Sequence, residues 1–338
     1  MKVADLLIRP YTEADEEQVL ECIVASLGGG PAGRRPPEFF RWKHYENPFG
    51  RSFILLAESD GRIAGVRAFM RWRFRAGSRD INAVRAVDTA THPDFQGGGI
   101  FTKLTLAALD AIRAEGTDLV FNTPNQNSLP GYLKMGWKTV GRVPVWIRIR
   151  RPVRFFMKLR SQEDAAAAAP AVDAPTAAEV LDTPGLEGLI ASVDADRARL
   201  HTVHSIEYLR WRYGRAPLLD YRAVREDGMD GQATGIAVFR VRPRGGLWES
   251  TLSELIVRPG DRVTARRLLR RVAQTARVDH IACHFSTGSD ARAAARRAGY
   301  VRAPGGITFV TNPLGDSIAP DPTSLPSWDL SVGDLEVF

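Results

Sequence analysis

Apolar and polar residues alternate along the first half of the chain in a pattern that predicts strands and amphipathic helices in turn. A short apolar strand at residues 6–8 precedes a helix that Thr12 caps and that continues to residue 27. A second helix is expected over residues 38–45, where Asn47-Pro48 ends it. The other expected elements are strands at residues 53–58, 63–74, 81–91, 119–122 and 139–150, and a helix at residues 100–115. This mixture of elements indicates an α/β (α+β) fold.

The second half of the chain repeats short motifs of the first half in the same order. The matched pairs are Arg41-Trp42 with Arg210-Trp211, His92-Pro93 with Arg258-Pro259, and Met135-Gly136 with Ala298-Gly299. Their spacings change by only a few residues along the chain, which indicates two copies of one fold.

The repeat suggests a division of the chain into domains. We expect a first domain at residues 1–158, an Ala- and Pro-rich linker at 159–178, a second domain at 179–315 and a tail at 316–338. The tail carries Trp328 and several other apolar residues, so we expect it to dock on a domain.

Composition narrows the possible classes of protein. The net charge is +7, but only six of the 46 basic residues are lysine and the arginines are scattered over both halves. We therefore do not expect nucleic acid as a partner. Early acidic residues and the lack of a long apolar run predict neither a signal peptide nor a membrane span. The two cysteines, Cys22 and Cys283, lie far apart, which favours a reduced, cytoplasmic protein.

A glycine run between a predicted strand and a predicted helix is the strongest chemical feature. Gly97, Gly98 and Gly99 allow close approach of the backbone, and the helix that follows offers free N–H groups and the positive end of its dipole. Such an arrangement is suited to binding a pyrophosphate.

The residues around this run resemble the GNAT family of acyl-CoA-dependent N-acyltransferases. The segment from Thr91 to Phe101 matches the family pattern V-x-P-x-x-[QR]-x-x-G-x-[GA], with Thr91 in place of Val and Phe101 in place of a small residue. Two further matches lie at residues 8–15 and at residues 125–137, where the family shows N-x-x-[AS]-x-x-x-Y-x-x-x-G-[FW]. The resemblance implies two tandem GNAT-like domains, each a mixed, mostly antiparallel sheet flanked by helices.

The resemblance also implies an acetyl-CoA donor and a set of residues that bind it. These are Thr89, Ala90, Thr91, Gln96, Gly97, Gly98, Gly99, Ile100, Phe101, Thr102, Asn125 and Ser128. Tyr132 is the expected general acid, because a phenol can protonate the leaving thiolate.

The general base and the acceptor pocket are less defined by the sequence. Asp88 precedes the coenzyme-contacting residues and is a candidate base. Residues at the end of the second helix and the C-terminal carboxylate are candidates for the pocket; they are Trp42, His44, Tyr45, Glu46 and Phe338. The recurrence of Trp42 as Trp211 favours core packing for that residue instead.

The second copy is expected to be silent. The glycine run is replaced after Pro259 by a segment with β-branched Val263 and Thr264, and Ala295 stands at the position of Tyr132. His280, Cys283 and His284 resemble metal ligands at first sight, but strand alternation points Cys283 away from the two histidines. We therefore expect a structural strand and no metal.

Three functions stay open on these grounds. The first is an N-acetyltransferase that moves an acetyl or short acyl group from CoA to a primary amine on a small molecule or a peptide. The second is a tRNA-dependent aminoacyl transferase of the Fem type, against which the intact glycine loop argues. The third is a non-catalytic module that binds acyl-CoA.

Overall fold

The computed structural model describes residues 6–27, 36–158, 168–194, 197–315 and 317–336. The chain divides into two compact units, each made from separate stretches. The first unit comprises Met1–Gly141, Thr308–Ser324 and Val337–Phe338, and the second comprises Arg142–Ile307 and Leu325–Glu336.

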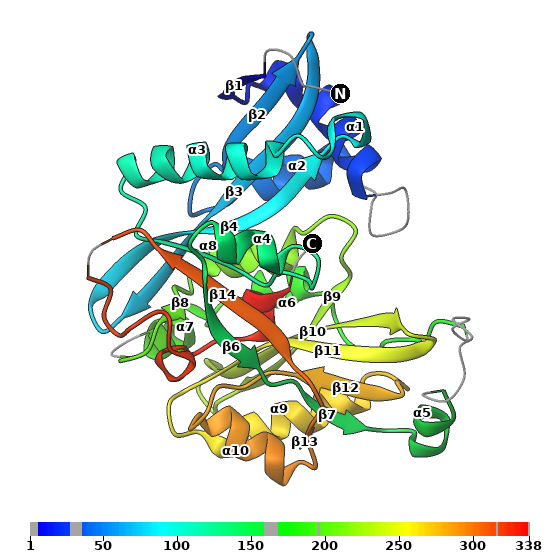
Figure 1. The fold of residues 1–338 in the computed structure, drawn as a ribbon. Helices are drawn as coiled ribbons and strands as arrows, with labels where there is room; N and C mark the ends of the chain where they lie inside the picture. The colour runs from blue at the N-terminus through cyan, green and yellow to red at the C-terminus, as the bar shows by residue number, and fades with distance from the viewer. Residues whose placement is uncertain (1–5, 28–35, 159–167, 195–196, 316, 337–338) are drawn as a thin grey trace. The chain divides into compact units, whose positions relative to one another are not determined.

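The first unit is built on one sheet, with strand order β1-β2-β3-β4-β5-β14-β6 (Figure 1). Strands β4 and β5 pair in parallel. Antiparallel pairing joins β1 with β2, β2 with β3, β3 with β4, and β5 with β14. The strands are β1 (Leu7–Pro10), β2 (Phe53–Ser59), β3 (Arg62–Ala76), β4 (Arg79–Thr91), β5 (Leu119–Asn122), β6 (Lys138–Val143) and β14 (Ile307–Pro313). The helices are α1 (Glu16–Leu27), α2 (Pro37–His44), α3 (Ile100–Ala114) and α4 (Leu129–Lys134).

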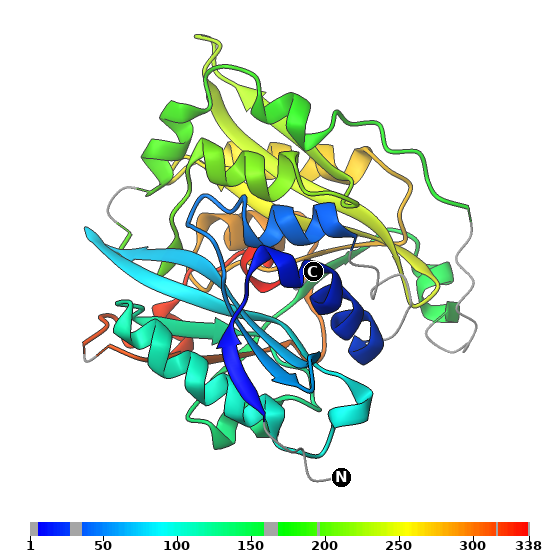
Figure 2. The same ribbon diagram turned by 90° about the horizontal axis from the view of Figure 1, so that it is seen from above.

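Helices α1 and α3 cover opposite faces of this sheet (Figure 2). Ile100, Leu104 and Ala108 of α3 are buried in a core with strand residues such as Phe69. Close packing requires Gly65 on β3, because a Cβ there would lie 2.6 Å from Cγ2 of Ile100. The helix start is therefore pinned to the centre of the sheet.

The second unit has a related sheet, with strand order β13-β7-β12-β11-β10-β9. Strands β11 and β12 pair in parallel, as β4 and β5 do in the first unit. The strands of this sheet are β7 (Trp146–Ile149), β9 (Tyr221–Asp227), β10 (Ala233–Arg244), β11 (Leu247–Val257), β12 (His280–Cys283) and β13 (Val301–Arg302). The short strand β8 (His201–Thr202) is not part of this sheet. The helices are α5 (Pro152–Lys158), α6 (Ala177–Leu181), α7 (Glu187–Asp194), α8 (Ile206–Leu209), the π-turn Arg210–Gly214, α9 (Arg262–Gln274), α10 (Asp290–Arg297) and α11 (Val332–Leu335).

The predicted repeat corresponds to matching positions in the two units. His92-Pro93 and Arg258-Pro259 follow β4 and β11, and each is followed by a helix, α3 or α9. A glycine that the sequence comparison did not use is shared as well. Gly235 on β10 matches Gly65, since a Cβ there would lie 2.7 Å from Cγ2 of Thr264 on α9.

The two units exchange one strand. In the first sheet, β14 from the end of the chain lies between β5 and β6. In the second sheet, β7 from the first half lies between β12 and β13. The expected strand at residues 139–150 is thus two strands that join different sheets, and Pro144, which lacks an N–H, lies in the break. Each unit is discontinuous in sequence, whereas the sequence analysis treats each domain as one continuous stretch.

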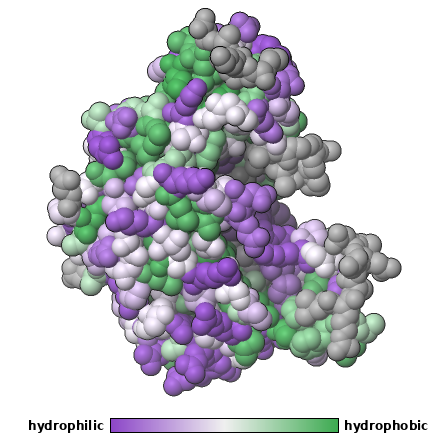
Figure 3. Space-filling view, viewed as in Figure 1, coloured by the Kyte–Doolittle hydropathy of each residue, from purple (hydrophilic) through white to green (hydrophobic). Residues whose placement is uncertain are grey.

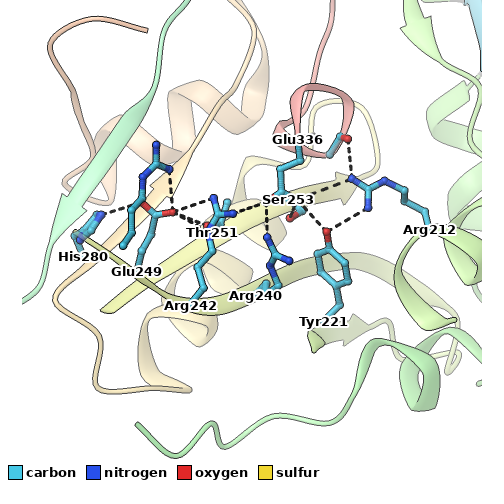
Figure 4. A network of polar contacts seen from close by, with 11 residues as sticks. Arg212, Tyr221, Arg240, Arg242, Glu249, Thr251, Ser253, His280 and Glu336 are labelled. Atoms are coloured by element: carbon cyan, nitrogen blue, oxygen red, sulfur yellow. Dashed lines mark hydrogen bonds and ion pairs between the residues drawn. The ribbon is translucent and has the colours of Figure 1, made fainter. Parts of the chain in front are cut away.

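The C-terminal segment packs within the second unit. Trp328, Leu330 and Leu335 are buried. The carboxylate of Glu336 accepts a hydrogen bond from Tyr221 Oη at 2.9 Å and one from Arg240 Nη2 at 3.2 Å (Figure 4). Apolar burial and a buried carboxylate therefore both hold this segment.

One exposed apolar face lies on α5, which comes just before the linker. Val153, Phe156 and Met157 are exposed there, and hydrophobic residues appear at the place of α5 in Figure 3. Within the described part of the chain, the helices are all too short or too polar to cross a membrane.

Candidate active site

The glycine loop forms an anion-binding geometry at the start of α3. Gly97 and Gly99 have φ angles of +83° and +71°, in the left-handed region that favours glycine. Gly99 is the N-cap residue, so no side chain caps α3, and the first turn holds no acidic residue. The first N–H groups of α3 are therefore available to an anion, and the helix dipole attracts it.

Strand β4 separates from β5 next to this loop. Their recorded pairing covers Ala83 to Arg85 of β4 and ends there. Further along, Ala90 and Thr91 pair with β3 on the other side. In the described residues, the edge of β4 near Thr89 that would face β5 thus has no strand partner, and its backbone can pair with an extended ligand.

Tyr132 lies on α4, and the buried Arg67 binds its hydroxyl group. Arg67 Nη1 donates a hydrogen bond to Tyr132 Oη at 2.9 Å and another to Thr89 Oγ1. Because the phenol oxygen accepts from Arg67, its own hydrogen is free to be donated elsewhere. The Phe101 ring meets the Tyr132 ring edge to face, with 5.5 Å between centroids, and leaves room only for glycine at Gly131.

The sequence analysis did not identify Arg67. The residue is fully buried, and its Nε and Nη2 atoms have no hydrogen-bond partner among the described residues. The signal in the sequence was a charged residue within the apolar strand at residues 63–74, because an arginine is seldom fully buried unless it has a polar partner.

Asp88 is a buried, ion-paired carboxylate on a bulge of β4. In this bulge, two residues of β4, Asp88 and Thr89, lie opposite a single residue of β3, Arg67. Asp88 has a φ of +40°. Its Oδ2 atom lies 2.6 Å from Lys43 Nζ and 2.9 Å from His44 Nε2. Burial by itself would raise the pKa of Asp88, but the Lys43 charge and the His44 hydrogen bond hold this pKa well below its usual range. These contacts disfavour proton abstraction by Asp88.

The second unit contains an equivalent of this carboxylate. Glu254 stands at the matching position of β11, and its Oε1 atom accepts a hydrogen bond from Tyr213 Oη at 2.8 Å. Tyr213 is two residues after Trp211, as His44 is two residues after Trp42. A contact that both copies keep fits a structural role better than a catalytic one.

Of the other residues expected to bind the coenzyme, some form hydrogen bonds within loops and others lie in the core or on the surface. Asn125 Oδ1 accepts hydrogen bonds from the N–H groups of Asn127 and Ser128 and so shapes the turn before α4. Gln96 Nε2 donates to the carbonyl of Thr91 at 3.3 Å, which closes the glycine loop. Ile100 is buried and Thr102 is exposed.

The predicted pocket residues do not form one surface. Trp42 and His44 are buried, Tyr45 is half-buried with its hydroxyl against Tyr11, and Glu46 is exposed. Phe338 lies outside the described residues.

In the second copy, carboxylate side chains accept hydrogen bonds from N–H groups around the start of α9. The corresponding helix start in the first copy has no side-chain cap. Asp261 Oδ1 accepts a hydrogen bond from the N–H of Thr264 at 2.9 Å and so caps α9. Asp290 Oδ2 accepts from the N–H of Gly260 at 2.9 Å and pairs with Arg262. Two negative charges at this position disfavour a phosphate.

The contact between Arg67 and Tyr132 in the first copy is also missing from the second. Gly65 pairs with Thr91 and Gly235 with Val257, so Ala237 takes the place of Arg67 two residues further on. Ala295 takes the place of Tyr132, as the sequence suggests. Both members of the contact are therefore absent together.

The sequence comparison now agrees with this geometry. Residues 7–140 match the family model described as an acetyltransferase (GNAT) domain. This part of the chain is a GNAT domain. No curated protein sequence matches the chain significantly.

Solved structures share the fold of this GNAT protein over most of its length. A probable N-acyltransferase of unknown function from Enterococcus faecalis V583 has a TM-score of 0.64 at 10% identity, covering 92% of this chain and 73% of that one. A GCN5-related N-acetyltransferase from Anabaena variabilis has a TM-score of 0.62 at 11% identity, covering 92% and 73%. Eis1 from Mycobacterium abscessus has a TM-score of 0.58 at 14% identity, covering 92% and 74%. These likenesses show that the fold extends over most of the chain, including both units.

The histidines of β12 and the loop after it have protein partners. His280 Nε2 contacts Glu249 Oε2 at 3.0 Å, and His284 Nδ1 contacts the carbonyl of Pro144 at 2.7 Å. Burial lowers the pKa of His284 to about 4 and raises that of the Cys283 thiol. Among the residues that the structure describes, no group of three or more His, Cys, Asp or Glu side chains is placed to hold a metal ion.

Proposed function

We propose that the first unit transfers an acetyl or short acyl group from acyl-CoA to a primary amine. The observation that carries the proposal is the contrast between the copies. The uncapped glycine loop and the Arg67–Tyr132 contact occur together in the first unit, and both are replaced in the second.

The residues of the first unit fit a CoA thioester. The N–H groups at the start of α3 would hold the pyrophosphate, and the free edge of β4 near Thr89 would pair with the pantetheine arm. Bound in this way, the thioester supplies an electrophilic carbonyl carbon and a thiolate leaving group. A backbone N–H of β4 would stabilise the negative charge on the carbonyl oxygen.

Tyr132 is the proposed general acid. The amine nitrogen bonds to the carbonyl carbon and loses a proton to water. As the C–S bond breaks, the leaving sulfur takes the Tyr132 proton. The charge of Arg67 stabilises the phenolate that remains. We do not assign the base to Asp88, because its carboxylate is already paired with Lys43. The terminal carboxylate of Phe338 stays the candidate from sequence.

Thiol release from acetyl-CoA in the presence of a panel of small amines and lysine peptides tests the proposal. We expect amine-dependent release of CoA with the intact protein and much slower release with Tyr132→Phe. Binding of acetyl-CoA without release for the whole panel would instead favour a non-catalytic module. Transfer from a charged tRNA without CoA release would favour the Fem-type reaction.

A further inference from the structure

The second unit contains a pocket at the position that corresponds to the coenzyme cleft of the first. Recorded pairing between β11 and β12 ends at Thr251 and Ala282, and the strands separate beyond them. A pocket of about 340 Å³ opens there, lined by residues 252–257 of β11, residues 284–286 after β12, and the C-terminal segment near Ser331. This volume is in the range of small-molecule sites.

The polar groups deep in this pocket are acidic. Glu254 and Asp334 both line it and are nearly fully buried. Glu254 Oε1 is held by Tyr213 and by Ser331 Oγ, each at 2.8 Å. Glu254 Oε2 has His204 Nε2 at 3.8 Å, beyond hydrogen-bond distance. Two hydroxyl groups therefore anchor Oε1 of this carboxylate, whereas the contact of Oε2 with His204 is longer.

His204 supplies an unused hydrogen-bonding group at the same place. Its side chain is only 9% exposed, and neither ring nitrogen has a hydrogen-bond partner among the described residues. A buried imidazole with two unpaired nitrogens is costly unless a ligand or water satisfies it.

The other charged groups of the pocket do not offset the two carboxylates. Asp329 pairs with Arg197 at 3.3 Å, and Asp290 pairs with Arg262 at 2.5 Å. Arg258 is exposed on the loop after β11. His204 lines the same pocket and is the basic side chain that pairs with Glu254.

The pKa directions agree with a negative potential inside the pocket. Burial and the neighbouring charge of Glu254 raise the pKa of Asp334. Burial by itself would lower the pKa of His204, but Glu254 and Asp334 raise it. Each shift favours the protonated form of the group, and nearby carboxylate charges have this effect on a pKa.

We propose that this pocket binds a small organic ammonium ion. Glu254 Oε2 accepts a hydrogen bond from the ammonium group, and His204, once it has lost its proton at higher pH, accepts another through a ring nitrogen. The second copy has thus kept the cleft of the fold and reversed its preference: carboxylates at Asp261 and Asp290 exclude phosphate, and those inside attract a cation. The inference does not depend on acyl transfer, because it concerns the other unit and needs no donor.

Calorimetry of the full chain with 1,4-diaminobutane at pH 8, without acyl-CoA, tests the proposal. We expect saturable binding, and none with 1,4-butanediol, which has similar length but no charge. Glu254→Gln and His204→Leu should each weaken binding about tenfold, as expected for loss of a hydrogen bond to a charged group. Asp220→Asn, an exposed change outside the pocket, should bind like the parent protein.

Three results would overturn the proposal. The first is that the diamine does not saturate the protein at ~10 mM, a range in which weak but specific sites saturate. The second is that the diol binds as well as the diamine. The third is that both pocket variants bind the diamine with unchanged affinity. The third result would place the diamine elsewhere, including the first unit. Thermal melting of each variant checks folding. If Glu254→Gln does not fold because it disturbs the Tyr213 contact, His204→Leu alone decides.

Discussion

At the scale of single residues, the contact between Arg67 and Tyr132 is the central feature of the proposal. The guanidinium sits 2.9 Å from the phenol oxygen in a buried setting, where an electrostatic contact is stronger than in water. The second copy has an alanine at both positions. We therefore treat this contact as the feature that distinguishes an active copy from a silent one.

The first prediction concerns this pair. Tyr132→Phe should lower kcat by about 100-fold or more, the usual contribution of a general acid, with little change in acetyl-CoA affinity. Arg67→Met should lower kcat as well, and the double variant should lose less than the product of the two effects. Steady-state kinetics with calorimetry of the donor measures this, and Arg73→Met, an exposed change on the same strand, is the control. Independent effects in the double variant would show that the two residues do not act together.

Asp88 gives the second prediction, which concerns stability. Asp88→Asn removes the carboxylate that pairs with the buried Lys43 and should cost about 3–5 kcal/mol of unfolding free energy. Lys43→Met combined with Asp88→Leu should recover most of that loss. Because the Asp88 pKa is lowered on folding, its ion pair adds stability above the ordinary pKa of an aspartate and loses it as the pH falls.

Denaturant unfolding over a range of pH, beside kcat of the folded protein, separates the two roles of Asp88. A structural carboxylate predicts a large loss of stability and a small loss of kcat. An Asp88→Asn protein of normal stability whose kcat falls as far as that of Tyr132→Phe would restore Asp88 as the base.

At the scale of elements, the two copies differ at the start of one helix, where the proposal places the phosphate of the donor. Helix α3 begins at a glycine with no side-chain cap, whereas α9 begins at Asp261, whose carboxylate already occupies the N–H of Thr264. The two helices are equivalent in the fold, so the difference lies in a few residues before each of them.

A third prediction follows for Gly99. Gly99→Ala should cost about 1 kcal/mol of stability, because an L residue is strained at a φ of +71°, and should weaken acetyl-CoA moderately. Gly99→Asp shares that strain but adds a negative charge, so it should weaken the donor at least tenfold more than the alanine does. Calorimetry with acetyl-CoA and melting of both variants measure these effects. Equal affinities in the two variants would mean that the pyrophosphate does not bind at this helix start.

At the scale of the whole molecule, the strand exchange makes each unit depend on both halves of the chain. Strand β14 completes the first sheet from beyond the second copy, and β7 completes the second sheet from the first half. A cut in the linker therefore removes a strand from the middle of each sheet rather than from an edge.

The fourth prediction uses this dependence. Residues 1–158 and 168–338 expressed separately should each aggregate or stay unfolded, because β5 and β6, or β12 and β13, are left with unpaired edges. Expressed together, they should form a soluble one-to-one complex. Size-exclusion chromatography and circular dichroism measure both results. A folded, monomeric fragment 1–158 would show that β14 is dispensable.

The sequence by itself determined many of the local elements and the copy that matches the GNAT family pattern. Hydrophobic periodicity located most helices and strands of the first half of the chain, because each element must bury one face. The glycine run and Tyr132 pointed to the first copy, because phosphate binding and proton transfer need particular residue types at fixed spacing. These are properties of short segments, and a single sequence carries them.

The tertiary structure alone decided which residues meet. The strand exchange, the contact of Arg67 with Tyr132 and the pairing of Asp88 with Lys43 join positions far apart in the chain, and no periodicity encodes such pairs. Asp88 looked like a base because it precedes the coenzyme-contacting residues. The fold surrounds it with cations on a bulge, and the pKa of a carboxylate is set by those neighbours rather than by its place in the sequence.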